Sequence, residues 1–142
     1  MFSQKTKYAI KALMYLARQD EREPVKTAEI AEKERIPKKF LEQILLDLKK
    51  ATFVSSKQGA NGGYYLLKPA DQINLAEIHR LFDGMVALLP CASLKYYEPC
   101  EDCIDEKNCG LRKALIDVRD KSFAALEHKT ISMLLQNEGW SV

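Results

Sequence analysis

The chain has 142 residues, of which 46% are hydrophobic and 30% are charged, and its formal net charge is +2. This length and composition predict one ordinary domain, or a small domain with an extension, that has enough apolar residues for a core. No apolar run approaches the ~20 residues that span a bilayer, and the first residues lead into an amphipathic helix instead of a signal peptide, so we exclude the membrane and secreted classes and expect a cytoplasmic protein.

The first predicted helix runs from Ser3 to Arg18. Its apolar residues recur with helical period and form one broad face, as in a helix that packs on a core. These residues are Tyr8, Ala9, Ile10, Leu13, Met14, Leu16 and Ala17. A polar connector from Asp20 to Pro24 follows the helix.

Two short helices joined by a tight turn are predicted between Thr27 and Lys50. Pro37 pushes Ile36 out of the helical region and suits the first turn of the second helix. That helix has an apolar stripe at Phe40, Leu41, Ile44, Leu45 and Leu48, and its other face carries Lys38, Lys39, Glu42, Gln43, Lys49 and Lys50. The pattern predicts a helix-turn-helix that places its second helix on DNA. The alternative is an ordinary helical hairpin whose charged face is only solvated.

A β-hairpin is predicted directly after these helices. Two β-prone runs, Phe53-Val54 and Tyr64–Leu67, flank a turn-forming stretch that contains Gly59, Asn61, Gly62 and Gly63. Lys57 and Lys68 flank the small, polar tip. A hairpin in this position is the wing of a winged helix, so we expect a mostly α fold with a small β-hairpin wing and a DNA-binding function.

The next predicted helix runs from Leu75 to about Asp83. Asn74 caps it, with Glu77 at the third position of a capping box. Leu75, Ile78, Leu81 and Phe82 are expected to face inward, and Gly84 ends the helix. His79 also lies here, and we assign it no function, because a lone helical histidine is usually a surface residue or a satisfied core residue.

A long C-terminal helix is predicted from Leu111 to about Leu135, or about 25 residues. A helix of this length cannot be covered by so small a domain. Its apolar stripe should therefore pack on the same helix of a second chain. A homodimer also suits DNA binding, because two recognition helices one helical turn apart match a palindromic operator.

Between these helices, residues 85–110 lack periodicity and hold all four cysteines in the spacing C-x8-C-x2-C-x5-C, at Cys91, Cys100, Cys103 and Cys109. Thiolates are soft ligands that select iron–sulfur clusters, zinc or copper(I). An iron–sulfur cluster is the prediction that we favour. A zinc site remains an alternative, although structural zinc ribbons usually contain two short C-x-x-C pairs and this loop contains one, Cys100 and Cys103. A thiol switch without metal also remains open.

The charges divide the chain in two. Residues 1–70 hold 14 Lys and Arg against 8 Asp and Glu, a net charge of +6, whereas residues 71–142 hold 8 against 12, a net charge of −4. A basic half is typical of a surface that binds DNA phosphates. The sequence does not favour a metal- or thiol-dependent enzyme. Its only histidines are His79 and His128, and it contains no phosphate-binding loop or nucleophile motif. A zinc-stabilised module without DNA binding would leave the basic half unexplained.

The run IPKKFLEQILLDLKKATFVSSKQGANGGYYL resembles the winged-helix transcription regulators of the Rrf2 family, the group that contains IscR and NsrR. The matching words are Ile36-Pro37, Leu41–Leu45, Val54–Ser56, Gly59 and Gly62–Tyr64, together with Tyr8-Ala9, Ala12-Leu13 and Tyr15–Ala17 in the first helix. The likeness covers nearly the whole chain.

The resemblance implies a cluster held by three cysteines, matched here by Cys91, Cys103 and Cys109. Cys100 is extra. IscR-like members have a histidine ligand where this chain has Arg112, and some relatives use an acidic residue of the partner's first helix, near Tyr8 in this sequence. The fourth ligand is therefore open, with Cys100 as the candidate. Members without a cluster, which respond to a protein partner or a metabolite, remain an alternative.

We expect three regions: a DNA-binding domain at 1–84, a cofactor loop at 85–110, and a dimerisation helix and tail at 111–142. We assign Lys38 and Lys39 to phosphates and Glu42 and Gln43 to base edges. Lys57, Gln58 and Tyr64 are the wing candidates. The family often has an arginine at Gln58, so Lys57 is the substitute candidate for the minor groove.

Overall fold

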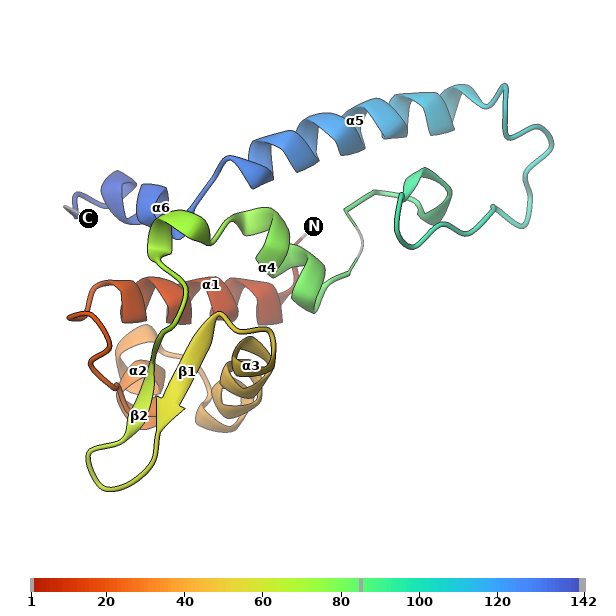
Figure 1. Ribbon diagram of the computed structural model, residues 1–142. Helices are drawn as coiled ribbons and strands as arrows, with labels where there is room; N and C mark the ends of the chain where they lie inside the picture. The colour runs from red at the N-terminus through yellow and green to blue at the C-terminus, as the bar shows by residue number, and fades with distance from the viewer. Residues whose placement is uncertain (1, 85, 141–142) are drawn as a thin grey trace.

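The computed structural model describes residues 2–84 and 86–140. Figure 1 shows a compact group of helices and one hairpin, from which a long helix extends. The elements in chain order are α1 (Gln4–Ala17), α2 (Thr27–Glu34), α3 (Lys38–Lys50), β1 (Val54–Lys57), β2 (Gly63–Leu66), the 3-10 turn η1 (Ala70–Gln72), α4 (Leu75–Phe82), the 3-10 turn η2 (Pro90–Ala92), α5 (Gly110–Glu127) and α6 (Ile131–Asn137).

The predicted helix-turn-helix is confirmed. The apolar stripe of α3 is fully buried at Leu41, Ile44, Leu45 and Leu48, where it packs on α1 and α2. Arg35 ends α2 in the left-handed conformation, so the chain turns sharply before Pro37 opens α3. The core of the domain forms between these three helices, and the charged side of α3 is left on the outside.

The wing is also confirmed. Strands β1 and β2 pair antiparallel with Val54 opposite Leu66 and Lys57 opposite Gly63. The chain before α2 adds a bridge to β2, where the backbones of Val25 and Tyr64 exchange two hydrogen bonds of 2.8 Å. A side chain at Gly63 would collide with this bridge, because its Cβ would lie 2.4 Å from the carbonyl oxygen of Val25. The wing is thereby fixed to the helix-turn-helix.

Helix α4 begins with the predicted capping box, in which Asn74 and Glu77 each bond the other's backbone. Ile78 is fully buried and Leu75 and Phe82 are half-buried, but Leu81 is 37% exposed, so its predicted inward position is wrong. Gly84 ends the helix region with a positive φ of 78°, a conformation that glycine adopts without strain.

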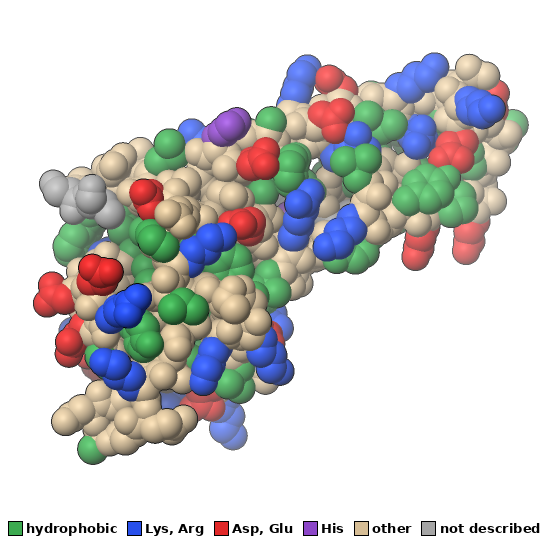
Figure 2. All heavy atoms as spheres, in the orientation of Figure 1, with side chains coloured by type: hydrophobic (Ala, Val, Ile, Leu, Met, Phe, Trp, Pro, Cys, Tyr) green, Lys and Arg blue, Asp and Glu red, His purple; other side chains and the backbone are tan. Residues whose placement is uncertain are grey.

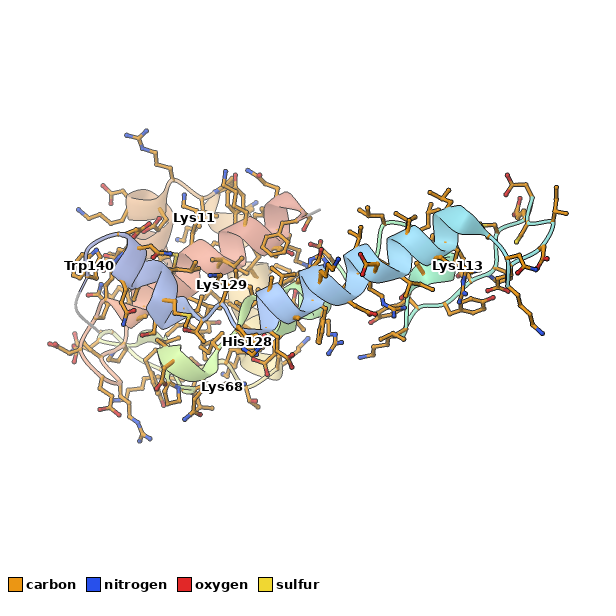
Figure 3. The ribbon with its side chains drawn as sticks, turned by 90° about the horizontal axis from the view of Figure 1, so that it is seen from above. Lys11, Lys68, Lys113, His128, Lys129 and Trp140 are labelled. Atoms are coloured by element: carbon orange, nitrogen blue, oxygen red, sulfur yellow. The ribbon has the colours of Figure 1, made fainter. Side chains whose placement is uncertain are left out.

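The prediction of a single long C-terminal helix is wrong, because the structure has two helices in this region. The chain leaves α5 after Glu127 and starts α6 at Ile131, with Thr130 as a new N-cap whose hydroxyl accepts from the Met133 backbone. The break pairs with the segment before α4: the Leu75 amide donates to the Lys129 carbonyl and the Ile131 amide to the Ile73 carbonyl, both at 2.9 Å. Figure 3 shows His128 and Lys129 at this break.

Helix α6 therefore returns to the winged helix. Ile131 and Leu135 are fully buried in its core, and α6 packs along α1. Arg18 at the end of α1 reinforces the contact, because it pairs with Glu34 at 3.1 Å and with Glu138 beyond α6. The last helix is thus part of the core of the winged helix and not a continuation of α5.

Helix α5 extends from this body toward the cysteine loop, which lies at its far end (Figure 1). None of its described residues is buried. Its start, Gly110, lies close to the predicted Leu111. Among residues 2–84 and 86–140, no helix is long and apolar enough to cross a membrane.

Candidate nucleic-acid interface and cysteine loop

The outer face of α3 carries the polar residues that were predicted from the sequence to contact DNA. Lys38, Lys39, Glu42 and Gln43 are all exposed. Gln43 is held by a 3.2 Å hydrogen bond to Asp47, one turn later on the helix. This face is chemically suited to base edges and phosphates, because it offers amide, carboxylate and ammonium groups in two successive turns.

The wing lies beside this face. The Lys49 ammonium donates to Ser56 at 2.6 Å and so joins α3 to β1. Tyr64 is half-buried on β2, and burial together with the charge of Glu42 raises the pKa of its phenol. The Lys49–Ser56 hydrogen bond and the packing of α3 on β1 thus place α3 and the wing side by side.

Lys57 and Gln58 are exposed where β1 enters the turn. The Lys57 ammonium lies 5.8 Å from the centre of the Tyr65 ring. Figure 2 shows Lys and Arg side chains on the winged-helix part of the molecule, whereas the hairpin tip carries few charges. A small tip of this kind fits the narrow minor groove.

The four cysteines lie in different surroundings. Cys91 belongs to η2 and is only 5% exposed, Cys100 and Cys109 are half-buried, and Cys103 is exposed. Cys109 is the N-cap of α5, and its sulfur accepts the Arg112 amide at 3.4 Å. A turn links the middle pair, since the Cys103 amide bonds the Cys100 carbonyl at 3.3 Å. All four thiols are free.

The thiols interact with one another. A hydrogen bond with Cys91 raises the pKa of the Cys100 thiol, and burial adds to the effect. Loss of hydration and then the charge of Cys109 raise the pKa of Cys103. The neighbouring cysteines therefore disfavour the thiolate forms of Cys100 and Cys103, and a cation would relieve this repulsion, because metal ligation requires deprotonated sulfur.

The donor set fits an iron–sulfur cluster or zinc by its chemistry, since four soft thiols share one loop. The geometry fits less well. In the described part of the chain, no three His, Cys, Asp or Glu side chains converge closely enough to hold a metal ion. Cys91 and Cys100 already meet, so a metal site would require the exposed Cys103 to approach them.

Two arginines of α5, which the sequence analysis did not identify as site residues, hold the turn that carries Cys91. The Arg112 guanidinium Nε donates to the Cys91 carbonyl at 2.9 Å, and Arg119 donates to the Ala92 carbonyl at 2.6 Å. Their spacing of seven residues places them on one face of the helix. The spacing of the two arginines can be read from the sequence, but the backbone carbonyls that they bind cannot.

A polar cluster at the end of α4 was also missed. The Asp83 carboxylate accepts from the Ser3 amide at 3.0 Å and from the Thr6 hydroxyl at 2.8 Å. His79 is buried beside it, and Phe2 stacks on the imidazole with ring centres 5.0 Å apart. The cluster ties the start of α1 to the point where the chain leaves the winged helix for the cysteine loop.

A groove of about 390 Å³ lies between this cluster and α5. Its lining is mostly apolar and consists of Phe2, His79, Val86, Ala87, Leu88, Val118, Arg119, Ser122, Ala125 and Leu126. The apolar stripe of α5 is therefore open on this side of the single chain.

Known proteins are similar to this chain in sequence and in fold. The chain is 43% identical to an Rrf2-like HTH-type transcriptional regulator of Rhodobacter capsulatus, over 95% of this chain and 92% of the relative. It is 29% identical to the transcriptional regulator NsrR of Oceanobacillus iheyensis, over 94% and 88% of the two chains. The structure of CymR, the global cysteine regulator of B. subtilis, superposes with a TM-score of 0.78 and 27% identity, covering 96% of this chain and 97% of CymR.

The match to the family model confirms the resemblance drawn from the sequence. Residues 2–137 match the family described as Rrf2, iron-dependent transcriptional regulator. The match spans the winged helix, the cysteine loop and both C-terminal helices. The chain therefore belongs to the Rrf2 family of transcriptional regulators.

Proposed function

We propose that this regulator is a homodimeric repressor that binds a palindromic operator, and that an iron–sulfur cluster held by the cysteine loop controls its affinity. The observation that carries the proposal is the arrangement of the two functional surfaces. The exposed face of α3 and the wing form one surface, and the four cysteines lie on a loop that is bonded to α5, outside the winged helix.

The DNA-binding part of the proposal rests on α3 and the wing. Lys38 and Lys39 are exposed at the start of α3, where ammonium groups reach phosphates, and Glu42 and Gln43 follow one turn later, where they can reach base edges. The wing would add contacts from Lys57, Gln58 and the phenol of Tyr64. The basic charge of residues 1–70 supplies the attraction to duplex DNA that does not depend on sequence.

The dimer part rests on α5. Leu111 and Val118 are 61% and 41% exposed on this helix, and the apolar groove beside it is open. A surface helix without buried residues gains little stability from its own chain, because packing of an apolar face supplies most of a helix's stability. The α5 helix of a second copy is the partner that best suits this stripe.

The cofactor part rests on the four thiols. Cys91, Cys103 and Cys109 would hold the cluster, and Cys100 would complete it. When bound, the cluster supplies electron transfer and reactivity toward oxygen or nitric oxide. The chain's own residues supply the response: α5 begins at Cys109, and Arg112 and Arg119 hold the Cys91 turn, so a change in the loop would be passed to the helix between the two winged domains.

An absorption spectrum of anaerobically purified protein, combined with operator binding at several salt concentrations, tests this function. We expect visible charge-transfer bands, and an affinity for duplex DNA that falls steeply with salt and changes when the bands are bleached. A colourless protein that contains stoichiometric zinc would make the loop a structural staple. A protein without affinity for duplex DNA would contradict the proposal as a whole.

A cluster-free regulator is the second candidate, and a specific observation favours it. Cys91 already raises the pKa of the Cys100 thiol, so the two thiols influence each other without a metal, whereas no group of three potential metal ligands converges in residues 2–84 and 86–140. Such a protein would respond through its thiols, a metabolite or a protein partner. Such a protein would still bind DNA. Its absorption spectrum would lack visible bands both before and after oxidation.

A further inference from the structure

The contacts of Arg112 join parts of the cysteine loop that lie far apart in the sequence. Its guanidinium donates to the Cys91 carbonyl at 2.9 Å, and its backbone amide donates to the Cys109 sulfur at 3.4 Å. One residue therefore contacts the first and the last cysteine of the loop. It does so from the first turn of α5, a rigid element.

The same side chain also orders the segments between the cysteines. Its Nε lies 3.4 Å from the Glu106 carboxylate, and that carboxylate accepts a hydrogen bond from the Tyr97 hydroxyl. Tyr97 lies between Cys91 and Cys100, and Glu106 lies between Cys103 and Cys109. The Arg112–Glu106–Tyr97 chain thus crosses the loop.

Arg119 strengthens the hold on the buried end. Its side chain donates to the Ala92 carbonyl at 2.6 Å and is fixed by Asp120 at 2.7 Å. Cys91 and Ala92 are nearly or fully buried although they belong to a loop. Two planar guanidinium groups, each aimed at a carbonyl of η2, explain why this turn lies against α5.

We propose that Arg112 is a positioning residue of the cysteine site: it holds Cys91 and Cys109 at a fixed separation, and Arg119 anchors the same turn. This inference rests on the proposed function of the loop as a cofactor site. Groups that orient metal ligands are typically needed for full affinity, and their loss lowers metal affinity about 10- to 100-fold. Arg112 differs from a ligand, because a guanidinium cannot deprotonate to bind a metal.

The test compares Arg112→Gln and Arg112→Lys with Lys113→Gln in the full-length chain. Lys113 is the matched control, because it is the exposed neighbour on the same turn (Figure 3) and its replacement removes the same charge. The first measurement uses reduced, metal-free protein. The alkylation of each cysteine by N-ethylmaleimide is followed by peptide mass spectrometry, with the exposed Cys103 as internal reference.

We expect Arg112→Gln to accelerate alkylation of Cys91 several-fold relative to Cys103, because the turn is released from α5. Arg112→Lys should behave similarly, since an ammonium lacks the planar donor geometry. Lys113→Gln should match the wild type. If Cys91 in Arg112→Gln is alkylated as slowly as in the wild type, the proposal is overturned. Slow alkylation of Cys91 in Arg112→Lys would also overturn it, because the protection of Cys91 would then depend on positive charge alone.

The second measurement uses anaerobically reconstituted protein. We expect Arg112→Gln to release iron to a chelator about 10- to 100-fold faster than the wild type and Lys113→Gln. An unchanged rate would overturn the positioning role in the loaded protein. A wild type that takes up no iron and sulfide would contradict the proposed function instead, and the alkylation experiment would still decide the role of Arg112.

Discussion

The Nδ1 atom of His79 lies 3.0 Å from Oδ2 of Asp83, across one turn at the end of α4. The same carboxylate oxygen also accepts from Ser3 and Thr6 at the start of α1. Burial opposes ionisation of Asp83, but the hydrogen bonds from Ser3 and Thr6 and the neighbouring His79 together lower its pKa below the ordinary value of 3.8. The ionised carboxylate thus joins two helices next to the exit toward the cysteine loop.

The first prediction concerns acid stability. Because the pKa of Asp83 is lower in the folded protein than in the unfolded chain, its stabilisation is fully present above the unfolded value of 3.8 and is lost as the pH falls through the folded pKa. Asp83→Asn should lower the free energy of unfolding by about 1–3 kcal/mol near neutral pH. It should also flatten the loss of stability below about pH 4.

Urea unfolding from pH 2.5 to pH 7 measures both effects. Asp71→Asn is the matched control, because Asp71 is an exposed carboxylate on η1. An Asp83→Asn variant with the acid dependence of the wild type would show that this carboxylate does not contribute through ionisation.

The second prediction concerns α6. Leu135 is fully buried against the winged-helix core, whereas Met133 on the same helix is 44% exposed. Leu135→Ala should therefore lower the free energy of unfolding by about 2–5 kcal/mol, and Met133→Ala should change it little. Equal small losses for both variants in urea unfolding would indicate that α6 is not part of the core.

This helix shows where the sequence was insufficient. The apolar period continues from Leu115 through Leu126 to Leu135, so local pattern alone predicts one helix. The break is fixed by two backbone hydrogen bonds with a segment distant in sequence: Leu75 donates to Lys129, and Ile73 accepts from Ile131. Thr130 was the available signal, because threonine is a favoured N-cap. The helix-turn-helix was predictable, since Pro37 and the stripe of α3 are local features.

The third prediction concerns the DNA surface. Lys39→Ala should weaken binding to all duplex sequences alike and reduce the slope of log affinity against log salt by about one unit, as expected for one lost phosphate contact. Glu42→Ala should instead change which operator is preferred, because its carboxylate can accept from cytosine N4. Lys113→Ala, on α5, is the control. Equal losses on operator and random DNA for both α3 variants would remove this assignment.

The fourth prediction concerns the dimer. Val118→Glu places a charge on the apolar stripe of α5, where Val118 is 41% exposed and lines the open groove. We expect monomers in sedimentation and a sharply reduced operator affinity, with an unchanged thermal midpoint of the winged helix. Lys113→Glu, which is exposed on the same helix, should remain dimeric. A wild type that sediments as a monomer at micromolar concentration would contradict this prediction.

The cysteine loop shows a different limit of sequence reasoning. The spacing identifies four candidate thiols, but it does not reveal that Cys91 is buried while Cys103 is exposed. That difference arises from Arg112 and Arg119, whose partners are backbone carbonyls. Any residue type supplies a carbonyl, so no pattern in the sequence marks these contacts.

The fifth prediction concerns ligand identity. Serine at Cys91, Cys103 or Cys109 should abolish cofactor retention, because the Asp and Glu residues of the loop are hard oxygen donors that replace a thiolate poorly. Cys100→Ser should also abolish retention, since Cys100 contacts Cys91 and Arg112 cannot ligate. The measurement is anaerobic reconstitution of the four single variants, with iron and sulfide counted per chain.

The outcome for Cys100 separates two kinds of site. Loss of the cofactor in all four variants defines a site made of four cysteines. A labile, oxygen-sensitive cluster in Cys100→Ser alone would instead require a fourth ligand from elsewhere, because three thiolates leave one position of the cluster open. Full cofactor content in Cys109→Ser would overturn the assignment of the loop, since Cys109 is the thiol at the start of α5 through which the loop would move that helix.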